Sequence, residues 1–400
     1  MKINFIKLLY EEENNMKKNK GITLVALVVT IVVLLILAGV SINLVLGNNG
    51  IIAKAKDAET KSAEASQNDL KGMNGLVSEM EGALAGNGST GSGSGNGNTG
   101  SGNNFVTKNT EVTYPDGKVW IPEGFKVAGD SASTVQGGVV IEDKDGNQFV
   151  WVPVATIADY KRTAYSTNGA TEETDTATNS IKIKYNSSLY NYYFTEAMPD
   201  DEKKSVDTYK GFYIGRYEAG DKESTEAKKL SGSNDVTKTV TIKKGQAPYN
   251  YVKKTQAVSL AEGFATKQGY KAKTKLVSSY AWDTTIAFLQ KVNSDYGERS
   301  EGNYREIAFS YTDITGASQT KSSSSSVLIP TGQTTPVCNI YDMGGNVWEW
   351  TTETSSFPGY PYAVRGGDYL CGFAGEPAGY RKVISDGAYD GYGFRLTLFM

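Results

Sequence analysis

A long apolar run near the N-terminus constrains this chain more than any other feature. No Asp, Glu, Lys or Arg occurs between residues 21 and 53, and residues 22 to 46 are mainly Val, Leu, Ile and Ala. A helix of about 20 apolar residues is long enough to cross the hydrocarbon core of a bilayer. We therefore predict a single-pass membrane protein. The basic residues just before the run should remain cytoplasmic, so the C-terminal part should lie outside the cell.

The residues around Gly21 resemble the class III signal of type IV prepilins, because a basic peptide at 16–20 precedes Gly21 and an apolar run begins at Ile22. The resemblance implies that residues 1–21 are a leader and that a prepilin peptidase cuts between Gly21 and Ile22. A start at Met16 would give a short leader. Most pilins carry Glu where this chain has Ala26, which favours a minor or tip subunit over a major one. An ordinary membrane anchor is the alternative.

Composition divides the rest of the chain into three parts. Residues 51–84 are rich in Ala, Lys and Glu, with apolar residues at helical spacing. We predict that they extend the membrane helix, so that a pilin-like helix covers 22–84. Residues 85–104 are almost all Gly, Ser, Asn and Thr and should form a flexible tether with a reach on the order of 25 Å. Residues 105–400 are the part long enough to bury a large core.

The sequence of residues 105–400 predicts an α+β domain. Short apolar or alternating segments at 139–141 and 149–152 are typical of strands. Two segments with helical spacing, 256–268 and 279–292, interrupt them. Strands mixed with a few helices indicate an α+β fold.

Charge and residue usage exclude several classes of function. A net charge of −3 gives no electrostatic reason to expect nucleic acid as a partner. The chain has no His, which excludes the usual Ser-His-Asp and Cys-His nucleophilic mechanisms. Its two cysteines, Cys338 and Cys371, are too few for a disulfide framework. Whether they pair with one another is left open, because sequence does not show that they meet.

Three ordered motifs carry the clearest family resemblance. YDMGGNVWEW at 341–350, RGG at 365–367 and GFRL at 393–396 resemble the C-terminal core of the formylglycine-generating enzyme (sulfatase-modifying factor) family. The match extends upstream through GNQFVWVPV to about residue 147. The resemblance implies an irregular C-type-lectin-like fold over 105–400, with its core at 147–400.

The family's copper chemistry is only half represented. Members that oxidise cysteine to formylglycine hold a copper ion with two cysteines five residues apart. The resemblance places the first at Cys371, but Glu376 stands at the second position. Iron-dependent relatives use histidines, which this chain lacks. The expectation is therefore a catalytically inactive domain. The alternative is a copper-dependent oxidase that acts on protein cysteine through Cys371.

The resemblance also implies a calcium site. Its ligands would be the side chains of Asp342 and Glu349 and the backbone carbonyls of Gly345 and Val347, oxygen donors that suit a hard cation. The alternative is that both carboxylates bond to backbone N–H groups. The neighbouring tryptophans should pack in the core, and the arginines of the last two motifs should pair with buried carboxylates such as Glu349.

The segment between the last two motifs has the composition of a binding surface. It is rich in Tyr, Gly, Asp and Ala and also contains Ser. Antibody loops likewise favour Tyr, Gly and Ser. A core role for the aromatic residues is the alternative. The arrangement also resembles the target proteins of diversity-generating retroelements, whose variable residues lie at this place. The predicted ligand contacts are Asp368, Tyr369, Phe373, Tyr380, Tyr389 and Tyr392.

These expectations combine into one hypothesis. The chain would be a membrane- or pilus-anchored, adhesin-like protein that displays an inactive lectin-type domain and binds an extracellular protein or glycan. Its other partners would be the prepilin peptidase and pilus subunits. A minor pilin that only primes filament assembly is a further alternative.

Overall fold

The computed structural model describes residues 104–167, 170–175, 180–185, 192–226, 236–299, 301–372 and 376–400. All of them belong to one unit, Asn96–Met400. The predicted leader (1–21, with the cleavage site at Gly21 and Ile22), the helix at 22–84 and nearly all of the tether lie outside the described residues, so these remain predictions. In the part that is described, no helix combines the length and apolarity needed to cross a bilayer.

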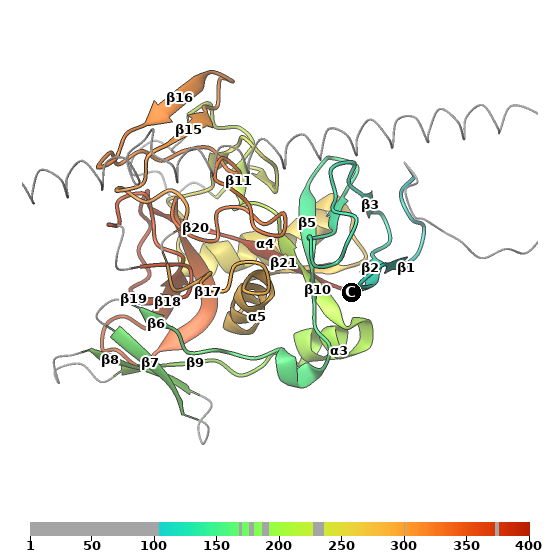
Figure 1. Ribbon diagram of the computed structural model, residues 1–400, viewed down its shortest axis with the longest axis horizontal. Helices are drawn as coiled ribbons and strands as arrows, with labels where there is room; N and C mark the ends of the chain where they lie inside the picture. The colour runs from blue at the N-terminus through green and yellow to red at the C-terminus, as the bar shows by residue number, and fades with distance from the viewer. Residues whose placement is uncertain are drawn as a thin grey trace, which may run out of the picture. The chain divides into compact units, whose positions relative to one another are not determined.

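A six-stranded sheet has the strand order β14-β21-β10-β5-β4-β3. Figure 1 labels β21, β10, β5 and β3 of this sheet. The apolar sequences of β5 and β10 suit strands that are buried on both faces. The last strand of the chain, β21, lies between β14 and β10. The strands are β3 (Lys126–Val127), β4 (Val140–Glu142), β5 (Gln148–Pro153), β10 (Gly211–Gly215), β14 (Lys273–Leu276) and β21 (Leu396–Phe399).

A second sheet brings the three sequence motifs together. Its order is β19-β18-β17-β9-β8-β7-β6, and β20 pairs in parallel with β17. In this sheet Glu349 lies opposite Arg365 on one side and Gly393 on the other. The strands are β6 (Ser166–Thr167), β7 (Ala170–Asp175), β8 (Ser180–Tyr185), β9 (Tyr192–Thr195), β17 (Trp348–Ser355), β18 (Tyr362–Arg365), β19 (Arg381–Ile384) and β20 (Tyr392–Phe394).

Smaller elements surround the two sheets. They are two hairpins, a three-stranded sheet with β11 in its middle, and one 3-10 helix. Their bounds are β1 (Thr110–Tyr114) and β2 (Gly117–Ile121), β15 (Phe309–Thr312) and β16 (Ser318–Lys321), β11 (Gly220–Asp221), β12 (Val240–Thr241) and β13 (Ala247–Pro248), and η1 (Ile157–Asp159).

Three α-helices occur among the described residues: α3 (Asp200–Tyr209), α4 (Lys254–Gln268) and α5 (Ser279–Leu289). Helix α4 ends at Gly269, whose φ of 76° suits the left-handed position after a helix. Ser278 caps α5 by accepting a hydrogen bond from the Ala281 N–H. Both predicted helices are confirmed, although α5 ends at Leu289 rather than at residue 292. The predicted α+β composition is confirmed as well.

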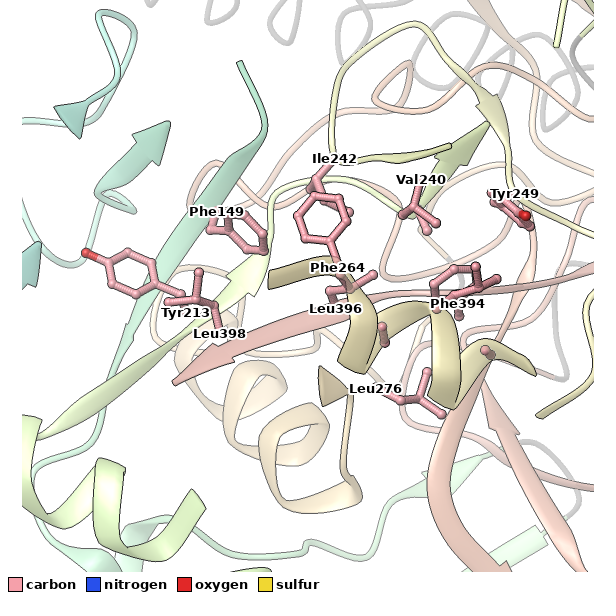
Figure 2. Packing of buried hydrophobic residues seen from close by; sticks show 14 of the residues in the cluster. Phe149, Tyr213, Val240, Ile242, Tyr249, Phe264, Leu276, Phe394, Leu396 and Leu398 are labelled. Carbon is pink, nitrogen blue, oxygen red and sulfur yellow. The ribbon is translucent and has the colours of Figure 1, made fainter. Parts of the chain in front are cut away.

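Apolar side chains fill the space between the six-stranded sheet and α4 (Figure 2). The Phe149 and Phe264 rings lie 6.4 Å apart, centroid to centroid, and join β5 to α4. Trp348 and Trp350 are also fully buried, which confirms their predicted core role. This core fixes β17, and with it the loops that surround β20.

Candidate functional site

The loop after β18 begins with two glycines that no other residue replaces without strain. Gly366 and Gly367 have φ values of 93° and 75°, in the left-handed region. A Cβ at Gly367 would lie 2.5 Å from the carbonyl oxygen of Glu376. The Tyr304 hydroxyl donates to the carbonyls of Gly366 and Glu376, at 2.5 and 3.0 Å. The RGG motif therefore turns the chain directly into the segment that carries Cys371.

The thiol of Cys371 lies between two carboxylates. Its Sγ is 2.9 Å from Oδ1 of Asp368 and 2.5 Å from Oε2 of Glu376, and it can donate its proton to either oxygen. Burial and the two negative charges raise the pKa of the Cys371 thiol. The sulfur is therefore held as a protonated hydrogen-bond donor. A thiolate, the form that attacks a substrate or binds a soft metal, is disfavoured.

The residues present do not fit the family's copper ion. Copper(I) is a soft cation that selects thiolate ligands. Here one sulfur is protonated and the second position is the carboxylate of Glu376, five residues along the chain. No step through copper follows from this arrangement.

Two of the predicted ligand contacts are buried, which corrects their expected role. Asp368 and Tyr369 are each only 6% exposed. Oδ1 of Asp368 accepts from the N–H groups of Leu370 and Cys371, both at 3.0 Å. The Tyr369 hydroxyl donates to Oδ2 of Asp390 at 2.8 Å. Both side chains support the loop from inside, because the residues that follow Gly367 turn back against β20.

The other predicted ligand contacts differ in how much of each side chain is exposed to solvent. Tyr389 is 55% exposed, whereas Tyr380 and Tyr392 are half-buried. The Tyr392 ring lies edge-on to Tyr389, at 5.4 Å, and to Trp350, at 5.6 Å. Phe373 lies outside the described residues, and its role stays a prediction.

Two residues that sequence reasoning missed join this surface. The backbone N–H of Tyr251 donates to the carbonyl of Tyr389 at 3.0 Å, and the half-buried Tyr251 has a φ of 52°. We call Tyr251, Tyr389 and Tyr392 the tyrosine face. Lys382 is the second, with its Nζ 4.5 Å from the Trp348 ring centroid and 3.4 Å from Glu376. No sequence signal links Tyr251 to Tyr389, because they lie far apart in the chain.

The proposed calcium ligands are held by protein groups. Asp342 accepts from the Gly332 N–H and the Thr334 hydroxyl, both at 2.5 Å. Glu349 forms a buried pair with Arg395, whose Nη2 lies 2.8 Å from Oε1. The predicted pairing of Arg395 with Glu349 is confirmed. In the set Asp342, Gly345, Val347 and Glu349, both carboxylates are therefore already engaged by protein donors.

A third buried carboxylate, that of Glu218, lies near the carboxylates of Asp342 and Glu349. Glu218 is buried and accepts from Asn346 Nδ2 at 2.7 Å and from the Val347 N–H at 3.2 Å. Burial raises its pKa, and the charges of Asp342 and Glu349 raise it further. Among the described residues no group of three or more metal-ligating side chains is arranged to hold an ion. Calcium binding stays a prediction that a calcium titration of the protein tests.

A separate buried network anchors β18 and β19 to α5. Arg381 Nε lies 3.0 and 3.1 Å from the two oxygens of Glu353, and Arg381 also pairs with Asp283. Arg365 pairs with Asp283 at 2.8 Å rather than with Glu349. Glu353 also accepts from Arg162. Because these charged groups are buried and paired with one another, we assign them a structural role rather than acid–base chemistry.

The two cysteines do not form a disulfide with each other. Cys338 is buried in the core around α5, and burial raises its pKa to about 11. Cys371 lies at the loop after Gly367, with its sulfur bonded to carboxylates. Neither sulfur has the surroundings of an activated thiol.

Comparison with known proteins identifies one family. The sulfatase-modifying factor enzyme 1-like domain matches residues 103–398. No curated protein matches the chain. Three solved structures are similar to it: PvdO from Pseudomonas aeruginosa (16% identity, 65% of this chain and 98% of that chain, TM-score 0.34), CarF (15%, 62% and 98%, 0.31) and Treponema denticola variable protein 1 (15%, 64% and 96%, 0.30). At these scores the three structures carry no functional argument.

Proposed function

Because this chain belongs to the sulfatase-modifying factor enzyme 1-like family, we propose that it uses the family scaffold to bind a ligand and not to catalyse a reaction. The observation that best supports this proposal is the position of the Cys371 thiol between Asp368 and Glu376. At this place the family's oxidases need two thiolates. Here the charge of the neighbouring carboxylates opposes formation of even one.

The tyrosine face is the surface that we assign to ligand contact. Tyr389 and Leu370, an exposed residue of the loop after β18, offer apolar area at the surface, with 55% and 47% of their areas exposed. Tyrosine contributes a large contact area at low entropic cost. The loops that carry these residues are attached to a rigid scaffold through β17, β18 and β20, an arrangement that recurs in binding proteins. Diversification of the exposed residues of these loops would change the contact surface.

Display outside the cell is the second part of the proposal. The apolar run at 22–46 and the Gly- and Ser-rich residues 85–104 support a membrane or pilus anchor with a tethered domain. The partners would be an extracellular protein or glycan, the prepilin peptidase and pilus subunits. Mass spectrometry of the protein from membrane fractions tests the anchor. A mature N-terminus at Ile22 supports pilin-type processing, and an intact leader rejects it.

A binding screen tests the recognition function. The full chain in detergent micelles would be screened against a glycan array and a panel of purified extracellular proteins. We expect at least one interaction that is lost in a variant combining Tyr389→Ala and Leu370→Ala. Tyr193→Ala is a matched control, because Tyr193 is a 45% exposed tyrosine on β9. If the double variant binds every probe as the unmodified chain does, the tyrosine face is not the binding surface.

A further inference from the structure

Carboxylates surround the tyrosine face at close range. Asp390 directly follows Tyr389, and its Oδ2 accepts from the Tyr369 hydroxyl. The carboxylate of Asp368 lies so close to Gly391 that a Cβ at Gly391 would clash with it. Glu376 reaches the same region through its contact with Cys371. Three acidic side chains, from two loops, therefore border the rings.

The pKa values of two tyrosine hydroxyls on the face reflect the nearby negative charges. Burial raises the pKa of Tyr392, and the negative charges of Asp368 and Glu376 raise it further. Burial and the charge of Asp390 raise the pKa of Tyr251 in the same direction. Both effects have the sign expected where negative potential reaches the rings.

Three cations near these rings have partners within the protein. Lys382 contacts Glu376 and the Trp348 ring. Arg305, near Gly372, pairs with Glu306 at 2.8 Å. The buried Lys254 donates to the carbonyls of Thr352 and Glu353. The contacts place the carboxylates of Asp368, Glu376 and Asp390 and the ammonium of Lys382 around the face. A further exposed cation, Lys253, follows Tyr251 by two residues in the chain.

We propose that the tyrosine face binds a lysine or arginine side chain of a protein ligand. This inference rests on the proposed binding function and specifies the ligand's chemistry. An aromatic ring attracts a cation that approaches its face, and a carboxylate beside the ring adds a charge-assisted hydrogen bond. Tyrosine is also enriched at protein–protein interfaces. The complementary charge favours a basic protein segment over a neutral glycan.

Three labelled peptides test the charge preference. Fluorescein-labelled peptides of ten lysines, ten glutamines or ten glutamates would be titrated into the full chain in detergent micelles, with fluorescence anisotropy as the readout. We expect the lysine peptide to bind, with an affinity that falls as salt rises, and the other two to bind weakly or not at all.

Matched variants assign that binding to the face. A variant with Asp390→Asn and Glu376→Gln should bind the lysine peptide about tenfold more weakly, the loss that corresponds to about 1.4 kcal/mol. Lys382→Gln should bind it more tightly, because it removes a repelling charge. Asp207→Asn changes an exposed carboxylate of α3 that pairs with Lys210 and should leave the affinity unchanged. Thermal unfolding of each variant shows whether it folds.

The outcomes separate this inference from the proposed function. Equal affinity of the carboxylate variant and the unmodified chain for the lysine peptide would overturn the inference. So would a ligand from the binding screen that is a neutral glycan and depends on Tyr389. In that second case the binding function would stand while its cation preference falls. If the Tyr389 and Leu370 variant loses no interaction at all, both proposals fail.

Discussion

The sulfur of Cys371 lies 2.5 Å from a carboxylate oxygen of Glu376. At the position where an oxidase of this family needs a second sulfur, this chain has a negatively charged acceptor that holds the thiol proton in place. The proposed loss of the family's copper chemistry rests on this pair. The pair also fastens the loop after Gly367 to the residues before β19.

Replacing Glu376 with Cys should create a two-sulfur copper site. The variant would carry two sulfurs five residues apart, the spacing of the family's copper ligands, and we expect it to take up one copper ion per chain. Competition with the chelator bicinchoninate measures this uptake. The control is the same variant with Cys371→Ser. Stoichiometric uptake by the unmodified chain would contradict the inactive reading and favour the oxidase.

The Cys371 thiol should react slowly with iodoacetamide at neutral pH. Burial and the adjacent carboxylates raise its pKa, so little thiolate is present. Changing Asp368→Asn and Glu376→Gln together removes the two charges, lowers the pKa and should speed alkylation. Peptide mass spectrometry follows the rate, with Cys338 as an internal reference. A variant that reacts no faster than the unmodified chain would show that the carboxylates do not control the thiol.

Glu353→Gln should destabilise the domain by about 3–5 kcal/mol, because it leaves buried arginines without their carboxylate. Arg381 and Arg162 both donate to Glu353 in the interior. Chemical denaturation measures the free energy of unfolding. Glu111→Gln is the control, since the Glu111–Lys118 pair is exposed and worth about 0–1 kcal/mol. A similar small loss in both variants would contradict a structural role for the buried network.

Glu196 should make stability fall as pH rises. Burial, and then the charge of Glu353, raise its pKa from 4.5 to about 7. The folded state therefore holds a proton that the unfolded state has released. The associated stability is present below pH 4.5 and is lost as pH rises to about 7, and it amounts to about 3 kcal/mol. The Ser279 N–H donates to the same carboxylate at 2.7 Å, which partly opposes the shift.

Glu196→Gln tests that dependence. Unfolding free energies of the unmodified chain and the variant would be measured by denaturation between pH 4 and pH 8. We expect the difference between the two proteins to change across this window, because glutamine does not titrate. A constant difference would mean that Glu196 does not carry the proton. The slope is the readout, since the absolute stability also reflects altered hydrogen bonds to Ser279 and Thr352.

Much of the fold could be predicted because its signals are local. The helical spacing predicted helices at 256–268 and 279–292 because it repeats along one segment, and α4 and α5 form there, with α5 ending at Leu289. The continuous apolar run of β5 likewise reflects a strand buried on both faces. The pairing of the strands could not be predicted from the sequence. Strands β21 and β5 both pair with β10, but they come from distant parts of the chain.

The candidate site also has features that the sequence predicts and features that depend on the tertiary structure. The sequence by itself determined which reactions lack their functional groups: there is no histidine, and Glu376 replaces a cysteine. Only the tertiary structure decided which tyrosines reach solvent. Tyr369 and Tyr389 occur in the same loop-rich segment, yet one is 6% and the other 55% exposed. Exposure depends on what packs against a side chain, and the segments that cover Tyr369 or bring Tyr251 to Tyr389 come from elsewhere in the chain.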